Sequence, residues 1–387
     1  MLIEVTDRHR ELATEFRQFA EEHVAPRASQ ADREERLAPS LVDQLREAGY
    51  LGSQLAPGVG GRGLDRVAYG FLHEELGRAC SSTRSLLTVH DMVAEAVSRL
   101  GSRSVREAWL PRLATGHTIA AFALTEPEAG SDAASVQTTA TSRANGYVLT
   151  GRKRWISFAQ LADVLFVVAR IDAGPLAGFL VPRDAPGLTL APMSGLLGLR
   201  ASMLAEIELD GVVVPDEARV GAVGMPDGLL LATALQLGRY SVAWGCVGIG
   251  EACVEASFRH SREREQFGVP IAAHQLIRRR LTEMVVSVRA ARLLCLEAGS
   301  AAERRVPEAV EATLVAKYFA SQAAVRCTEH AVQIHGGSGC SDALPIERYF
   351  RDARMMEVIE GTTEILQLLI PGGRLAAGAA DDAGAHP

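Results

Sequence analysis

One carboxylate in this chain stands in a setting suited to removing a proton from carbon. Glu360 directly precedes Gly361, so it lies beside a backbone turn and the start of a helical pattern. A carbon acid next to a carbonyl group is weak, so its base needs a raised pKa, which desolvation of a carboxylate provides. Glu360 is therefore the predicted base. A capping acid at a helix start is the alternative reading of the same residue.

A second polar segment, far upstream, has residues suited to holding a cofactor. It runs Leu124-Thr125-Glu-Pro-Glu-Ala-Gly130-Ser131, in which Thr125 offers a hydroxyl and Gly130 and Ser131 allow close backbone approach. Trp155 follows a hairpin signal at Asn145-Gly146 and could pack against an aromatic ring system. Taken alone, the segment could be an ordinary polar turn, and Trp155 a buried core residue.

Bulk properties exclude several classes of protein. The net charge is -7 and no long Lys/Arg tract occurs, so nucleic acid is not an expected partner. The most apolar run, residues 241–250, is shorter than the ~20 residues that span a bilayer and predicts a buried helix, not a membrane segment. The N-terminus lacks signal-peptide character, which predicts a cytoplasmic location. The six cysteines have no metal-like spacing, so no metal site is expected and the thiols are predicted to be reduced and mostly buried.

The hydrophobic periodicity changes twice along the 387 residues. Helical spacing dominates residues 1–119, short alternating strands with turn signals dominate 120–225, and helical spacing returns in 226–372. These ranges are the predicted domains, with a flexible tail over 373–387. The strand pattern predicts a small antiparallel barrel or sandwich. The glycine-rich residues 57–63 lack the context of a nucleotide-binding loop, and they are interpreted as a connection between helices.

The segments from Phe350 to Glu364 and from Ala123 to Ala133, taken together, resemble the acyl-CoA dehydrogenase family. The resemblance covers about residues 5 to 370. It implies an α+β fold with an N-terminal helical domain, a middle antiparallel β-barrel and a C-terminal four-helix bundle. It also implies FAD as cofactor, removal of a proton and a hydride from neighbouring carbons, and a homodimer or homotetramer. The electrons would pass to an electron-transfer flavoprotein or to oxygen.

The resemblance also implies a set of residues that bind the flavin. They are Phe122, Leu124, Thr125, Gly130, Ser131, Trp155, Ile156, Ser157, Arg264, Gln266, Phe267, His274, Gln275, Gln333, Gly336, Gly337, Thr362 and Glu364. Arg264 and the loop at Gln333 to Gly339 would reach the cofactor of a neighbouring subunit. Without the family context, the first would belong to a solvated helix end and the second to a common glycine turn. Many relatives have glutamine where Glu364 stands.

The same resemblance places Ser131, Gln236, Arg239 and Gly361 near the substrate. Some relatives carry their base at the position of Gly238, where glycine has no side chain to serve, and this favours Glu360. The residue at Gln236 is typically an aspartate that meets the pantetheine.

Two acyl carriers are compatible with the sequence. Residues 80–90 and 238–249 look like the subfamily associated with polyketide pathways, which acts on acyl carrier proteins to make hydroxymalonyl or methoxymalonyl extender units. A short-chain acyl-CoA dehydrogenase is the alternative. A flavin-dependent oxidase or monooxygenase of the same fold, or a non-catalytic interaction protein, are further alternatives.

Overall fold

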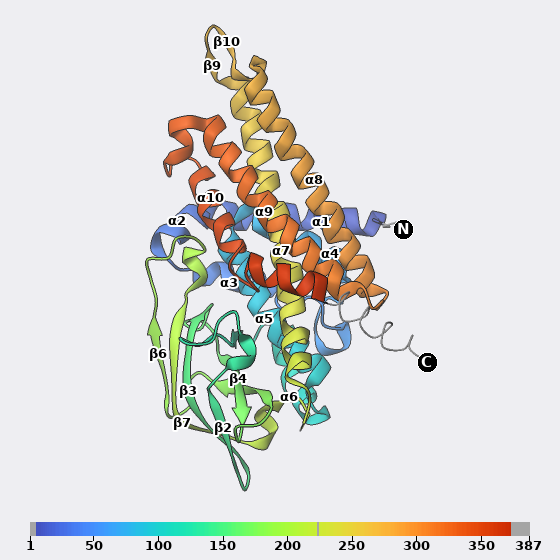
Figure 1. The fold of residues 1–387 in the computed structure, drawn as a ribbon, viewed down its shortest axis with the longest axis vertical. Coiled ribbons are helices and arrows are strands. Elements are labelled where there is room, and N and C mark those ends of the chain that lie inside the picture. The colour runs from blue at the N-terminus through green and yellow to red at the C-terminus, as the bar shows by residue number, and fades with distance from the viewer. Residues whose placement is uncertain (1–4, 223, 373–387) are drawn as a thin grey trace, which may run out of the picture.

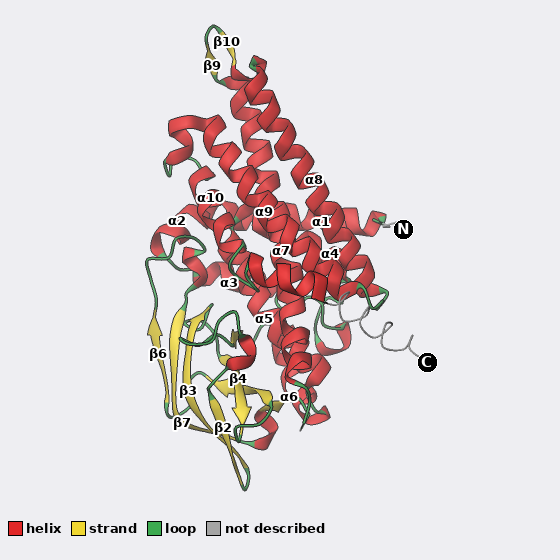
Figure 2. Ribbon diagram, in the orientation of Figure 1, coloured by secondary structure: helices red, strands yellow, loops and turns green. Residues whose placement is uncertain are grey.

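A computed structural model describes residues 5–222 and 224–372. The predicted tail from 373 to 387 lies outside these residues. In the described part, a group of N-terminal helices and a set of long C-terminal helices pack together, and a β-sheet lies against one end of this helical body (Figures 1 and 2). This is the helix, sheet and helix order that the periodicity predicts.

The N-terminal helices start where the sequence offers caps. They are α1 (Asp7–Phe19), α2 (Ala25–Glu34), α3 (Pro39–Glu47), α4 (Arg66–Ala79), α5 (Ser81–Leu100) and α6 (Arg103–Ala114), with a π-helical turn at Ala20–Val24. Thr6 and His9 form a capping box at α1, and the Asp65 carboxylate accepts a bond from the Ala68 N–H at α4. Residues 57–63 connect α3 to α4, as expected of an inter-helix loop.

The middle region forms one eight-stranded sheet. Its strands are β1 (Ala120–Ala123), β2 (Thr139–Arg143), β3 (Gly146–Ile156), β4 (Val164–Ile171), β5 (Leu176–Pro182), β6 (Leu188–Pro192), β7 (Ala205–Val214) and β8 (Arg219–Val220). The order is β6-β7-β3-β2-β4-β5-β8, with β1 beside β4. As the Asn145-Gly146 pair predicts, β2 and β3 form an antiparallel hairpin with its turn at these residues.

One part of the sheet departs from the antiparallel expectation. β4 pairs in parallel with β1, where Phe122 lies opposite Phe166, and also with the start of β2. The chain enters β1 from helix α6 and returns to β4 through a long crossover, which is the connection that parallel neighbours require. The sheet is therefore mixed, although its other pairings are antiparallel.

The C-terminal helices surround the long helix α7 (Asp227–Glu263). They are α8 (Gln275–Glu303), α9 (Ala309–His335) and α10 (Ile346–Met356), followed by a helix over 363–372. A small hairpin of β9 (Glu265–Gln266) and β10 (Val269–Pro270) joins α7 to α8. Glycines let α4 approach α7 closely, because a Cβ at Gly248 would lie 2.0 Å from the Glu74 carbonyl oxygen. The predicted buried helix at 241–250 is the middle of α7.

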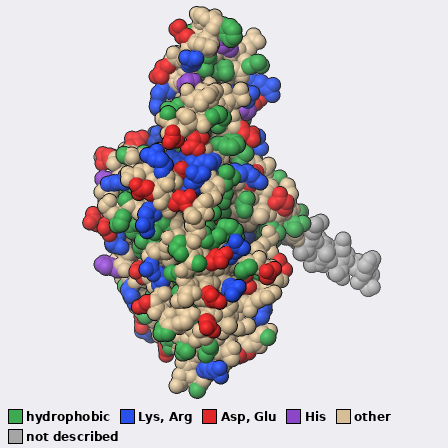
Figure 3. Space-filling view, turned by 90° about the vertical axis from the view of Figure 1, so that its left-hand side faces the viewer, with side chains coloured by type: hydrophobic (Ala, Val, Ile, Leu, Met, Phe, Trp, Pro, Cys, Tyr) green, Lys and Arg blue, Asp and Glu red, His purple; other side chains and the backbone are tan. Residues whose placement is uncertain are grey.

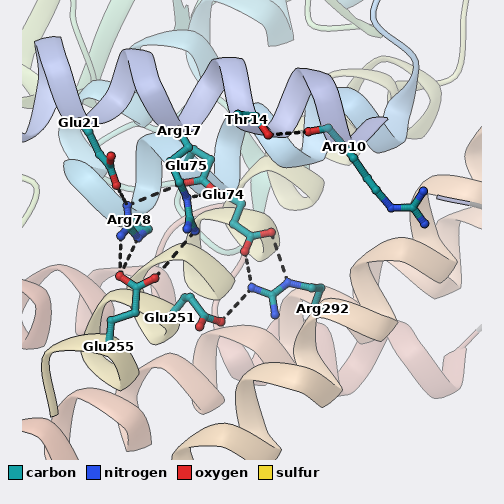
Figure 4. Close-up of polar contacts among 10 residues, drawn as sticks. All are labelled: Arg10, Thr14, Arg17, Glu21, Glu74, Glu75, Arg78, Glu251, Glu255 and Arg292. Atoms are coloured by element: carbon teal, nitrogen blue, oxygen red, sulfur yellow. Dashed lines mark hydrogen bonds and ion pairs between the residues drawn. The ribbon is translucent and has the colours of Figure 1, made fainter. Parts of the chain in front are cut away.

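Charged side chains tie α1, α4, α7 and α8 together at one interface (Figure 4). Arg78 donates to Glu255 and, at 3.0 Å, to Glu21, while Arg292 contacts Glu74 and lies 3.0 Å from Glu251. Because several of these groups are partly or wholly buried, removing one partner leaves another charge without compensation. This cluster joins the N-terminal helices to the bundle.

Arg78 therefore provides a test of that junction. Arg78→Met should lower the free energy of unfolding by about 2 kcal/mol, because Glu255 and Glu75 lose a partly buried counter-charge. Thermal unfolding followed by circular dichroism measures the effect. Arg103→Met is the control: its partner Glu107 is exposed, so the loss should be at most ~0.5 kcal/mol. Equal shifts for the two variants would contradict the assigned role of the cluster.

Candidate active site

Glu360 lies in a left-handed turn between α10 and the helix at 363–372. Its φ angle is 56° and that of Gly361 is 95°, so two successive residues adopt the conformation that favours glycine. A non-glycine residue held in this region indicates local strain that the surrounding structure must maintain. The Glu360 oxygen Oε2 is buried and has no hydrogen-bond partner among the described residues. The turn and the helix start that the sequence predicts are both present.

The carboxyl group of Glu360 packs directly against helix α7. A Cβ atom at Gly238 would lie 2.6 Å from Glu360 Oε2 and 2.8 Å from the sulfur of Met92. Any larger residue at this position would displace the carboxyl group. Gly238 therefore does more than lack a basic side chain, because its small size makes the space that Glu360 occupies.

Two cationic side chains hold the backbone of this turn. Lys317 Nζ donates to the Gly361 carbonyl oxygen at 2.6 Å, and Arg239 Nε donates to the Glu360 carbonyl oxygen at 3.1 Å. The Thr362 hydroxyl accepts a bond from the Ile365 N–H at 3.3 Å and caps the following helix. These bonds reach the turn from α9 and α7, so the position of Glu360 depends on both helices.

The electrostatic setting suits a base. Burial raises the pKa of Glu360, while Arg239, Lys317 and Arg84 oppose that shift. Burial also lowers the pKa of Lys317 to about 8. Because three cations surround a single carboxylate, the site can stabilise negative charge that develops on a bound molecule.

On the sheet side, Trp155 is the last residue but one of β3, and its ring is partly open to solvent. Its φ is 61° and it is 48% exposed, which rules out the reading of a buried core tryptophan. The Arg154 guanidinium lies 4.8 Å from the ring centroid, and the Arg154 N–H donates to the Thr125 carbonyl oxygen at 2.8 Å. That bond brings the Thr125 and Trp155 segments together. Ile156 is buried and Ser157 begins the next turn.

A buried ion pair, which the sequence interpretation missed, positions the Thr125 segment. Lys153 Nζ lies 2.7 Å from Glu126 Oε1 and donates to the Leu124 carbonyl oxygen at 3.0 Å. Glu126 also accepts bonds from the Gln137 and Thr138 N–H groups at 2.6 and 2.9 Å. Three separate stretches of chain therefore meet at this pair, which fixes the loop that begins at Leu124.

The other residues predicted around this loop differ in their exposure to solvent. Gly130 and Ser131 are exposed, and a Cβ at Gly130 would meet nothing within 4 Å. The side chains of Phe122 and Leu124 are buried, with Phe122 stacked on Phe166 at 5.5 Å, so only their backbone groups are free to meet a ligand.

The remaining predicted residues form a second group at the other end of the bundle. Arg264, Gln266, Phe267, His274 and Gln275 lie on or next to the β9–β10 hairpin, and Gln333, Gly336 and Gly337 lie at the end of α9. Figure 1 shows the hairpin at the tip of the α7–α8 pair, away from the sheet. Phe267 is 95% exposed. One chain therefore does not bring this group to the Thr125 and Trp155 loop.

Some of the predicted substrate residues contact Glu360 and others do not. Arg239 and Gly361 meet Glu360 directly. Gln236 instead donates from Nε2 to the Ala309 carbonyl oxygen at 3.2 Å, and its Oε1 is buried without a partner among the described residues. Glu364 is exposed on the first turn of the last helix.

These features fit FAD in its chemistry. The exposed ring of Trp155 offers an apolar face for an isoalloxazine, and Thr125 and the open loop at Gly130 offer hydrogen-bonding groups beside it. The exposed Phe267 and Arg264 at the hairpin offer an aromatic face and a cation for a phosphate.

Within residues 5–222 and 224–372, no cluster of three or more His, Cys, Asp or Glu side chains is arranged to hold a metal ion. In the same ranges no helix is long and apolar enough to cross a bilayer.

Known proteins match the chain over nearly its full length. Family models for the acyl-CoA dehydrogenase N-terminal, middle and C-terminal domains match residues 6–117, 121–212 and 228–374. The mouse mitochondrial short-chain specific acyl-CoA dehydrogenase is 35% identical over 96% of this chain and 90% of its own length.

Solved structures agree with this match. Butyryl-CoA dehydrogenase from Megasphaera elsdenii superposes with a TM-score of 0.93 at 30% identity, covering 97% of this chain and 100% of the other. FkbI, a protein for biosynthesis of the methoxymalonyl extender unit of the polyketide Fk520, superposes with a TM-score of 0.87 at 33% identity, covering 94% and 99%. The chain belongs to the acyl-CoA dehydrogenase family of FAD-dependent oxidoreductases.

Proposed function

We propose that the chain dehydrogenates an acyl thioester and that Glu360 removes the proton from the α-carbon. The observation that carries this proposal is the buried Glu360 Oε2, which has no hydrogen-bond partner among the described residues and lies in a strained turn held by two cations. A carboxylate oxygen that accepts no hydrogen bond is free to accept a proton from the substrate. FAD, when bound, supplies the acceptor for the hydride that leaves the β-carbon.

The residues around Glu360 support this chemistry. Lys317 and Arg239 fix the turn, so the carboxyl group keeps its orientation while it takes up the proton. Their charges lower the free energy of the enolate oxygen that develops as the proton leaves. Met92 and Gly238 cover the carboxyl group from α5 and α7, which limits competition from water.

We further propose that the acyl group is short and is carried by an acyl carrier protein, as in precursor formation for polyketides. The likeness to FkbI supports this, as does Gln236 in place of the aspartate expected to meet a CoA pantetheine. The short-chain acyl-CoA dehydrogenases among the relatives support CoA as the alternative carrier. An electron-transfer flavoprotein, or oxygen, would accept the electrons.

The group at the β9–β10 hairpin supports a homodimer or homotetramer. Because Arg264, Phe267 and Gln333 lie away from the Trp155 loop of their own chain, we propose that they contact the cofactor of a second copy.

The role of Glu360 predicts a specific loss. Glu360→Gln should still bind FAD but reduce it with acyl thioester at least ~10³-fold more slowly, because the amide does not accept the proton. Anaerobic stopped-flow bleaching of the flavin band measures this rate. Gly238→Ala should also slow it, since its Cβ displaces the carboxyl group, whereas Gly130→Ala, with open space around it, is the control. A Glu360→Gln enzyme of unchanged rate would sink the mechanism.

The pKa of Lys317 predicts an alkaline limb. As pH rises through about 8, Lys317 loses its proton and its charge, so flavin reduction should slow roughly tenfold. Lys317→Met should be slow at pH 7 and should lack this limb. Lys153→Met at saturating FAD is the matched control, because Lys153 has a pKa of about 8 but lies in the Leu124 loop. If Lys317→Met keeps the limb and Lys153→Met loses it, the assignment is wrong.

The carrier proposal is tested with one acyl group on two carriers. Purified flavoprotein should be bleached at least ~10-fold faster by the acyl carrier protein thioester than by the matched CoA thioester, because recognition of the carrier adds binding energy that CoA does not supply. Reduction by the CoA thioester alone would refute the carrier proposal and leave the role of Glu360 intact.

A further inference from the structure

The β6–β7 loop, residues 193–204, belongs to the sheet region but is held by both helical regions. Just after α2, Glu35 accepts the Gly195 N–H with both carboxylate oxygens, each at 3.1 Å. From α10, Arg351 donates to the Leu197 carbonyl oxygen at 3.1 Å. In Figure 1 the loop rises from the top of β6 toward α2. The three regions of the chain therefore meet at this loop.

A buried carboxylate on α10 holds the next part of the β6–β7 loop. Asp352 is 3% exposed, and its Oδ1 accepts the Leu199 N–H at 2.7 Å. The two backbones approach closely, because a Cβ at Gly198 would lie 2.5 Å from the Arg351 carbonyl oxygen. Burial raises the pKa of Asp352 to about 6, against the effect of Arg348, so the group is mostly ionised at pH 7. An ionised acceptor makes this hydrogen bond stronger than a neutral one would be.

Three successive hydrogen bonds lead from Asp352 to the segment that carries Trp155. Beyond the Leu199 N–H, the Leu199 carbonyl oxygen accepts the Ser202 N–H at 3.0 Å, and the Ser202 carbonyl oxygen accepts the Phe158 N–H at 2.7 Å. Leu199 and Phe158 have left-handed φ angles of 53° and 58°, which the surrounding bonds must maintain. Ser202 and Phe158 are fully buried. The position of the Trp155 segment therefore depends on α10.

The same helix leads to Glu360. α10 ends at Met356, and the Ile359 N–H donates to the Met355 carbonyl oxygen at 3.0 Å, so the turn at Glu360 follows directly from the helix. Asp352 lies about one helical turn before the end of α10. One short helix therefore connects the predicted base with the loop that supports the predicted flavin surface.

We propose that Asp352 is a positioning residue that fixes the predicted flavin surface at Trp155 relative to the base Glu360. The inference rests on the proposed function, in which a proton leaves the α-carbon for Glu360 and a hydride leaves the β-carbon for the flavin. Both acceptors must stand at the correct separation, because a displacement of about 1 Å slows a reaction by about 10²-fold. Asp352 acts through the β6–β7 loop and α10 and is not itself a catalytic residue.

The test separates removal of the proton from transfer of the hydride. Butyryl pantetheine thioester undergoes both, and anaerobic flavin reduction measures the complete reaction. In the methylthioacetyl thioester, sulfur replaces the β-carbon, so no hydride is available, and exchange of the α-hydrogen in heavy water, measured by mass spectrometry, reports Glu360 alone. Asp352→Ala should slow flavin reduction at least ~10-fold and α-hydrogen exchange less than ~2-fold. A purely structural role would lower both rates equally.

Three variants keep the outcome decisive. Asp352→Asn retains an acceptor oxygen of the same reach and should restore most of the rate of flavin reduction. Gly198→Ala, whose Cβ pushes the β6–β7 loop away from α10, should slow flavin reduction selectively and gives a readout if Asp352→Ala does not fold. Gly58→Ala is the matched control and should change neither rate, because an added Cβ there meets nothing within 4 Å. An equal loss of both rates in Asp352→Ala and Gly198→Ala would overturn the positioning role.

A measurement on the resting flavoprotein does not depend on turnover. In Asp352→Ala, amide hydrogen exchange should become severalfold faster in peptides that cover 155–160 and 199–204 and stay unchanged in α9, because the loss of support is local. Unchanged exchange in both loop segments would overturn the inference. If these segments respond while the unmodified protein neither exchanges the α-hydrogen nor reduces its flavin, the proposed function fails and the support of the loop by Asp352 stands.

Discussion

The contact between the Glu360 carboxyl group and the bare backbone of α7 at Gly238 constrains the rest of the site. A buried carboxylate is stable only where charge and shape both accommodate it, and here the shape comes from a missing side chain and the charge from Arg239 and Lys317. These groups belong to α7 and α9, so the packing of the bundle decides where the carboxylate points. The carboxylate sits on a short turn, but long helices determine its position.

The sheet and the bundle contribute different parts of the proposed site. The sheet presents an open aromatic surface at Trp155 and a loop fixed by the Lys153–Glu126 pair, whereas the bundle presents the carboxylate and its cations. Figure 3 shows acidic and basic side chains interspersed over one face of the molecule, without an extended field of one sign. Charged groups that form no ion pair among the described residues lie instead in the interior, at Glu360 and Arg84. Little solvent reaches them there, so the electrostatic interactions of these groups are stronger than at the surface.

Local signals were sufficient to predict the element types and the turn at Glu360. Short alternating segments predicted a strand-rich region over 120–225, the Asn145-Gly146 pair predicted the hairpin, and Gly361 indicated the turn that follows Glu360. The parallel pairing of β1 with β4 was not predictable, because the register of distant strands leaves no local pattern. Arg84 and Lys317 were missed for the same reason, since their partners lie on other helices. One signal was available: Lys153 and Lys317 are the only lysines in an arginine-rich chain, and each holds one loop of the site.

The burial of both lysines has a chemical consequence for an enzyme that handles activated acyl groups. Thioesters acylate unprotonated amines without a catalyst, and exposed ε-amino groups are the usual targets in proteins. Lys153 and Lys317 are 1% and 0% exposed, and every other basic position carries arginine or histidine, which form no stable amide with such donors. The surface of this protein therefore offers no side-chain amine for thioesters in solution to acylate, and reagents directed at ε-amines would leave the folded surface unlabelled.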